Sequence, residues 1–147
     1  MVSTVASATI LGARGHPVTV EVHVAPSGLP GLTMLGLPDE SCREARDRVR
    51  AAITSAGLEW PNKKVVVNLA PPQFRKAGSG LDLAIAVACL AAFGTVPSTA
   101  LDGSVRRLPG VAPMVGVRPD LDWVVPIECT AEARVAGRGA VFGVDSL

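Results

Sequence analysis

The stretch from Asn68 to Gly94 constrains the fold of this chain more than any other. It reads NLAPPQFRKAGSGLDLAIAVACLAAFG, in which a Pro-rich loop follows a β-branched run and leads into an almost wholly apolar, Ala-rich segment. Between Ser79 and Thr95 the only polar side chain is that of Asp82. A helix without a polar face has to be covered on most of its sides. The stretch therefore predicts a strand, a loop and a buried helix at the centre of the domain.

Length and composition place the chain among folded domains. Its 147 residues, taken as a single domain from 1 to 147, suffice for a hydrophobic core. Apolar residues make up 48% of the chain and charged residues 18%, which excludes a disordered chain. The formal net charge is +1, so the molecule as a whole has no strong attraction for a polyanion.

Cysteine usage and hydropathy indicate the compartment. The three cysteines are far apart in sequence and only two His residues are present, so we expect reduced, buried thiols and no metal site. The first residues lack the pattern of a signal peptide. The longest apolar run, Leu83 to Phe93, is shorter than the roughly 20 residues that span a bilayer. We expect a cytoplasmic protein without membrane contact.

Periodicity predicts the other elements of an α+β fold, a mixed sheet with helices packed on one face. Strands are expected over Val5–Leu11, Pro17–Ala25, Leu32–Leu35, Lys63–Leu69, Ser104–Leu108, Trp123–Ile127 and Ala140–Val144. Helices are expected over Pro38–Gly57, Leu81–Phe93 and Glu128–Ala136. The first three strands are joined by short loops, which predicts an antiparallel meander or hairpin arrangement. Pro38 suits a first helical position, and Ser41 with Glu44 suits a capping box.

Few residues are candidates for catalysis. Neither GxxxxGK[ST] nor a complete GxGxxG fingerprint is present, and the glycines around Ser79 are typical of a turn. Ser79 itself lies near the start of the predicted helix, and a helix N-terminus can stabilise the negative charge of a nucleophile. No His follows residue 23, so a dyad would need a lysine. The lysines available to it are Lys63, Lys64 and Lys76. We expect no catalytic or cofactor-binding residue in this chain.

A local excess of basic residues is the main candidate for binding. From Arg43 to Lys76, eight Lys or Arg stand against three acidic residues. Such an asymmetry can contact phosphates or an acidic partner. The alternative is a solvated helix face with internal ion pairs, such as Glu44 with Arg48. The candidate contacts with nucleic acid or a protein partner are Arg43, Arg46, Arg50, Lys63 and Lys64.

Several blocks together resemble the N-terminal domain of the ComM/YifB proteins, which are magnesium-chelatase-like AAA+ ATPases. They are GLPGLTMLGLP, REARDRVRAA, VNLAP and GLDLAIA. The resemblance is close from Val5 to about Pro97 and looser beyond, where Pro113, Gly116 and Pro119 interrupt a helix of the family. That region is similar to the proteolytic domain of Lon and the C-terminal domain of RadA. The resemblance therefore implies the fold of ribosomal protein S5 domain 2.

The same resemblance implies a function without catalysis. Laid along the Lon sequence, the places of the catalytic Ser and Lys fall on Gly80 and Ala112, which carry neither reactive group. In the family an AAA+ module follows and binds ATP and Mg²⁺, so we expect this chain to be one domain of a longer protein and to hold no cofactor. Its implied partners are its own AAA+ module, neighbouring subunits and DNA, in branch migration, recombination or transformation.

Two other functions stay open. The first is a Lon-like peptidase with a displaced dyad of Ser79 and Lys76, or of Ser79 and another lysine. The second follows the magnesium-chelatase name and is assistance in metal insertion into a porphyrin, although the sequence offers no cluster of His and carboxylates for it.

Overall fold

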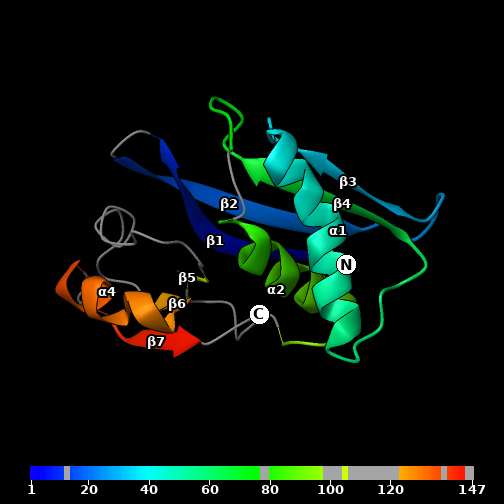
Figure 1. The fold of residues 1–147 in the computed structure, drawn as a ribbon. Helices are drawn as coiled ribbons and strands as arrows, with labels where there is room; N and C mark the ends of the chain where they lie inside the picture. Colours follow the sequence, from blue (N-terminus) through cyan, green and yellow to red (C-terminus); the bar gives the residue numbers. More distant parts are fainter. Residues whose placement is uncertain (12–13, 77–79, 98–103, 106–122, 137–138, 145–147) are drawn as a thin grey trace.

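The described residues form a mixed seven-stranded sheet in the computed structural model, in the order β3-β4-β2-β1-β5-β6-β7 (Figure 1). The structure describes residues 1–11, 14–76, 80–97, 104–105, 123–136 and 139–144. The strands are β1 (Val2–Leu11), β2 (Arg14–Val24), β3 (Gly31–Leu35), β4 (Lys64–Ala70), β5 (Ser104–Val105), β6 (Trp123–Pro126) and β7 (Val141–Val144). The helices are α1 (Glu40–Ser55), α2 (Asp82–Phe93), the 3-10 turn η2 (Ile127–Cys129) and α4 (Thr130–Ala136).

The arrangement of the first strands corrects the predicted meander. Strands β1 and β2 do pair antiparallel, and β2 pairs antiparallel with β4. Strand β3, however, pairs in parallel with β4, with Gly31 opposite Lys64 and Leu35 opposite Asn68. The helix α1 connects these two strands, and such a crossover allows parallel neighbours where a tight turn does not. In the order of the described strands, β3 lies at the edge of the sheet, next to β4.

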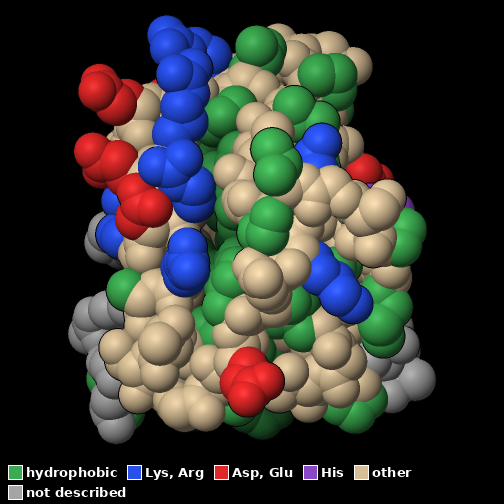
Figure 2. Space-filling model, turned by 90° about the vertical axis from the view of Figure 1, so that its right-hand side faces the viewer, with side chains coloured by type: hydrophobic (Ala, Val, Ile, Leu, Met, Phe, Trp, Pro, Cys, Tyr) green, Lys and Arg blue, Asp and Glu red, His purple; other side chains and the backbone are tan. Residues whose placement is uncertain are grey.

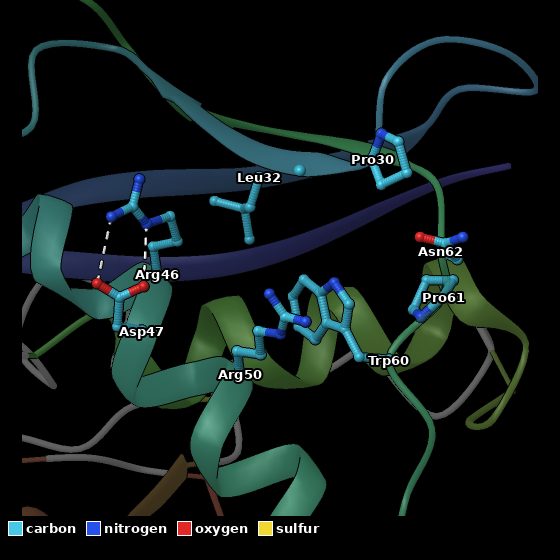
Figure 3. A pocket seen from close by; sticks show the side chains of 9 residues that line it. Pro30, Leu32, Arg46, Asp47, Arg50, Trp60, Pro61 and Asn62 are labelled. Carbon is cyan, nitrogen blue, oxygen red and sulfur yellow. Dashed lines mark hydrogen bonds and ion pairs between the residues drawn. The ribbon is translucent and has the colours of Figure 1, made fainter.

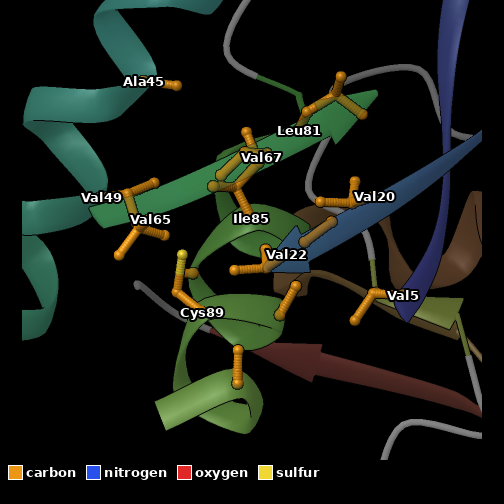
Figure 4. Packing of buried hydrophobic residues seen from close by; sticks show 14 of the residues in the cluster. Val5, Val20, Val22, Ala45, Val49, Val65, Val67, Leu81, Ile85 and Cys89 are labelled. Atoms are coloured by element: carbon orange, nitrogen blue, oxygen red, sulfur yellow. The ribbon is translucent and has the colours of Figure 1, made fainter. Parts of the chain in front are cut away.

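The main core lies between one face of the sheet and the helices α1 and α2. The alternation of β2 is as predicted, because Val18, Val20 and Val22 are buried. Figure 4 shows valines of β1, β2 and β4 pointing toward side chains of both helices. Nine of the twelve residues of α2 are buried. The prediction of a buried central helix is therefore confirmed.

The start of α1 corrects the predicted cap. Asp39 is the N-cap, and its Oδ1 accepts a hydrogen bond of 2.7 Å from the Cys42 amide. Pro38 thus precedes the cap and is not the first helical residue. Ser41 and Glu44 form no capping box, because an aspartate one residue after Pro38 already satisfies the free amide. The helix ends at Ser55 with Ala56 as its C-cap, and the predicted Gly57 follows one residue later with a φ of +74°.

The second half of the chain follows the sequence prediction where it is described. Strands β6 and β7 and helix α4 match their predicted ranges to within two residues, and β5 covers the first two residues of the strand expected to end at Leu108. The interrupted segment with Pro113, Gly116 and Pro119 lies outside the described residues. In the described part of the chain, no helix is long and apolar enough to cross a membrane.

Candidate interface for nucleic acid or a protein partner

A groove runs between helix α1 and the edge strand β3. It consists of two adjoining hollows of about 380 Å³ and about 510 Å³, which share Leu32, Arg46 and Asp47 as lining residues. Figure 3 shows the first hollow, with Leu32 of β3 across from Arg46 and Arg50 of α1, and with the Trp60 ring beside Arg50. We call this feature the α1–β3 groove. The lining side chains used below are Leu32, Met34, Arg43, Arg46, Arg50 and Trp60.

The periodicity of α1 places three arginines along this groove. The helix buries Cys42, Ala45, Val49 and Ile53 in the core. Positions three and four residues apart lie on one face of a helix. Arg43, Arg46 and Arg50 follow this spacing on the flank that faces β3, and all three are exposed. The same helical spacing therefore places the apolar residues of α1 on the core face and the three arginines on the flank beside β3.

The groove combines a row of arginines with an apolar floor, and Glu40, Glu44 and Asp47 also line it. Figure 2 shows Lys and Arg side chains in a column beside a hollow that exposes hydrophobic side chains, with acidic groups on the outer side of the column. Arg46 Nε pairs with Asp47 Oδ1 at 3.1 Å, and this hydrogen bond lowers the pKa of Asp47. Among the described residues no carboxylate lies within ion-pair distance of Arg43 or Arg50. Their charges are available to a ligand.

The two predicted lysines lie elsewhere. Lys63 lines a separate hollow beside Met1, His23 and Phe93. Lys64 extends its stem toward Gly28, where an added Cβ would lie 3.4 Å from Lys64 Cδ. The structure therefore brings Arg43, Arg46 and Arg50 together and leaves Lys63 and Lys64 out of the groove.

Arg48 belongs to the opposite flank of α1. The predicted ion pair with Glu44 is present at 3.3 Å. The shorter contacts of Arg48 are with Asp82 on α2, at 2.6 Å and 3.1 Å, and with the Ser41 carbonyl at 2.9 Å. The hydrogen bond to Asp82 raises the pKa of Arg48. The predicted pair of Glu44 with Arg48 is therefore present, and the shorter contacts with Asp82 join α1 to α2.

Lys76, the lysine of the peptidase alternative, is buried and bonded to backbone carbonyls of its own loop. Its side chain is fully buried, and its Nζ donates hydrogen bonds to the Pro71 carbonyl and, at 3.0 Å, to the Phe74 carbonyl. Nζ also lies 4.6 Å from the centroid of the Phe74 ring. Burial lowers the pKa of Lys76. Gly80 is buried, whereas Ser79 and Ala112 lie outside the described residues.

The backbone of Lys76 joins this loop to the start of α1. Its amide donates to the Leu37 carbonyl at 3.1 Å, and its carbonyl accepts from the Asp39 amide at 2.9 Å. The lysine thus holds the loop before α2 in place. In the described part of the chain, no three His, Cys, Asp or Glu side chains gather as metal ligands would.

Fold and groove define a class of protein: a small α+β domain with a groove between α1 and the edge strand of its sheet. A family model described as subunit ChlI of Mg-chelatase matches residues 20–119. The chain is 41% identical over 150 residues to a YifB protein of Salmonella typhimurium, an alignment that covers 93% of this chain and 29% of that protein. It is 40% identical over 116 residues to the competence protein ComM of Haemophilus influenzae, with 71% of this chain and 23% of ComM covered.

The chain belongs to the ChlI family of magnesium-chelatase-like proteins, as the ChlI-like N-terminal region of the YifB and ComM proteins. It spans less than a third of the length of the curated relatives that it matches. The predicted resemblance is confirmed.

Proposed function

We propose that this chain is a non-catalytic accessory domain of a ComM-like AAA+ ATPase that acts in DNA processing, in branch migration, recombination or transformation. The observation that carries the proposal is the row of exposed arginines, Arg43, Arg46 and Arg50, on a domain of the YifB/ComM family. The row would contact DNA or a neighbouring subunit, and Lys63 and Lys64 would extend the contact. The name of the Haemophilus influenzae relative, a competence protein, supports a role in DNA uptake.

The rest of the proposal concerns the longer protein. ATP and Mg²⁺ would bind to its AAA+ module, and this chain would hold neither. The fold would be that of ribosomal protein S5 domain 2 and the Lon proteolytic domain, a proposal supported by the mixed sheet with α1 and α2 on one face. A role in DNA processing would put the protein in the cytoplasm.

A salt-dependent titration tests the DNA contact. A labelled duplex and a labelled single strand are titrated with the chain, and binding is followed by fluorescence anisotropy. If three arginines neutralise three phosphates, the affinity should fall about 40-fold between about 50 mM and about 200 mM salt. The variant with Arg43→Ala, Arg46→Ala and Arg50→Ala should lose this binding. A control with Arg14→Ala and Arg134→Ala, two exposed arginines outside the groove, should retain it. Absence of binding at the lower salt concentration removes the DNA role.

A further inference from the structure

We propose that the α1–β3 groove binds an extended, acidic peptide segment of a protein partner, which adds to the sheet as a strand beside β3. This inference goes beyond the proposed function and does not depend on a DNA contact. Three features of the groove carry it: an edge strand whose outer side pairs with no other described strand, an apolar floor, and the arginine row.

The backbone of β3 is ready to pair on its outer side. In a parallel ladder, alternate residues of a strand bond to a given neighbour. The Gly31 amide donates to the Lys63 carbonyl at 3.3 Å, so Gly31, Thr33 and Leu35 face β4. The amide and carbonyl groups of Leu32 and Met34 therefore point away from β4. Because β3 ends the sheet, these groups have no strand partner among the described residues.

The floor beside this edge is apolar. The side chains of Leu32 and Met34 are half-buried and pack against the main core. At one end of the groove, Trp60 stands edge-on to Phe93, with ring centroids 5.1 Å apart. Backbone pairing gives an added strand its affinity, and pockets for alternate side chains give it specificity. An aliphatic floor therefore suits the side chains of an added peptide strand.

The arginine row selects the charge of the peptide. Seven residues separate Arg43 from Arg50, which corresponds to about 10 Å along the helix. Alternate side chains of a strand are about 7 Å apart, which is close to the roughly 6 Å of helix rise from Arg46 to Arg50, so two carboxylates on one face of an added strand can meet this pair. Arginine binds a carboxylate through two parallel hydrogen bonds. Glu40 and Glu44 line the second hollow, whereas the first hollow has Arg46 and Arg50 against Asp47 alone, so the carboxylates of the peptide would lie at the first hollow.

A synthetic peptide of about eight residues, in which glutamate alternates with valine and both ends are blocked, tests the site. Its binding to the chain is measured by fluorescence anisotropy. The same peptide with lysine in place of glutamate should not bind. Two further peptides carry N-methyl groups on alternate amides, one in each register. A strand beside β3 uses only one set of amides for pairing, so one of these peptides should lose at least about tenfold in affinity and the other should bind as the parent does.

Variants separate this site from a DNA contact. The double variant Arg46→Ala with Arg50→Ala should weaken peptide binding by about tenfold or more. The control Lys63→Ala with Lys64→Ala should not, because neither lysine lines the groove. Equal binding of the two N-methylated peptides, or no binding of the glutamate peptide, overturns the proposal. A DNA duplex that binds through the arginines while the peptide does not would assign the row to nucleic acid, which overturns the peptide site and leaves the proposed function standing.

Discussion

The guanidinium of Arg48 on α1 holds both carboxylate oxygens of Asp82 on α2, with Nε 2.6 Å from Oδ2 and Nη2 3.1 Å from Oδ1. Asp82 is the first residue of α2 and is 8% exposed. A carboxylate at that place is also stabilised by the helix N-terminus. The only polar side chain of the buried helix therefore fastens the two helices that cover the sheet.

Asp82→Asn should weaken the contact with Arg48, because the asparagine side chain has nearly the same shape as aspartate but carries no charge. We expect a loss of about 2 kcal/mol in the free energy of unfolding, because a charged acceptor is removed from a largely buried hydrogen-bonded pair. Urea denaturation followed by circular dichroism measures the loss. The matched control is Asp47→Asn, whose ion pair with Arg46 is exposed to solvent, so this variant should unfold at nearly the same urea concentration as the parent chain. Equal losses in both variants would contradict a structural role for the pair with Arg48.

Gly36 connects β3 to α1 at a point where no side chain fits. Its φ is +94°, and a Cβ added to it would lie 2.1 Å from the Leu69 carbonyl oxygen of β4. Gly36→Ala should cost about 3 kcal/mol or more, from backbone strain and overlap together. Gly57 also has a positive φ, of +74°, but has nothing within 4 Å of an added Cβ. Gly57→Ala should therefore cost only about 1 kcal/mol. Similar losses in a denaturation experiment would refute the close approach of β4 to Gly36.

Much of the fold could be predicted because its signals are local. The alternation of Val18, Val20 and Val22 and the apolar stretch of α2 each identify an element within a few residues. The pairing of β3 could not be predicted, since a strand gives no sign of which neighbour it will have. The N-cap was missed for a similar reason: Asp39 and Ser41 both suit the position, and only the backbone path decides between them.

The groove could be predicted only in part. The spacing of Arg43, Arg46 and Arg50 along a helix was visible in the sequence, and the structure places all three on one flank. Lys63 and Lys64 were grouped with them because they are near in sequence, but the chain turns away between Trp60 and β4. The apolar floor and the free edge of β3 depend on tertiary structure. The alternation of Leu32 and Met34 was the only signal that could have pointed to them.

The burial of the Cys89 thiol predicts how the free energy of unfolding changes at alkaline pH. Burial raises the pKa of Cys89 from 9.0 to about 12, so the folded protein resists its ionisation. The stabilisation is fully present below pH 9 and is lost as the pH rises toward 12, because the unfolded thiol ionises first. Between pH 9 and about pH 10.5 the loss should be on the order of 2 kcal/mol. Lys76 acts in the opposite direction, since burial lowers its pKa.

Cys89→Ala isolates the thiol from the other groups. The variant should be less stable than the parent chain at pH 8, and this difference should shrink by on the order of 2 kcal/mol at about pH 10.5. Urea denaturation at a series of pH values measures both chains, and the contribution of Lys76 cancels in the comparison. Stability curves that run parallel across this range would show that the thiol of Cys89 is not protected from ionisation.

The peptidase alternative makes the opposite claim about Lys76 and is tested by chemical labelling. A serine-directed fluorophosphonate should leave this chain unlabelled, because the Nζ of Lys76 is buried and bonded to two loop carbonyls. Labelling that disappears in Ser79→Ala would establish an activated serine instead. The structural role of Lys76 predicts that Lys76→Met costs about 2 kcal/mol of stability, since it leaves two buried acceptors without donors. Arg75→Ala, the exposed neighbour, should cost less than about 0.5 kcal/mol.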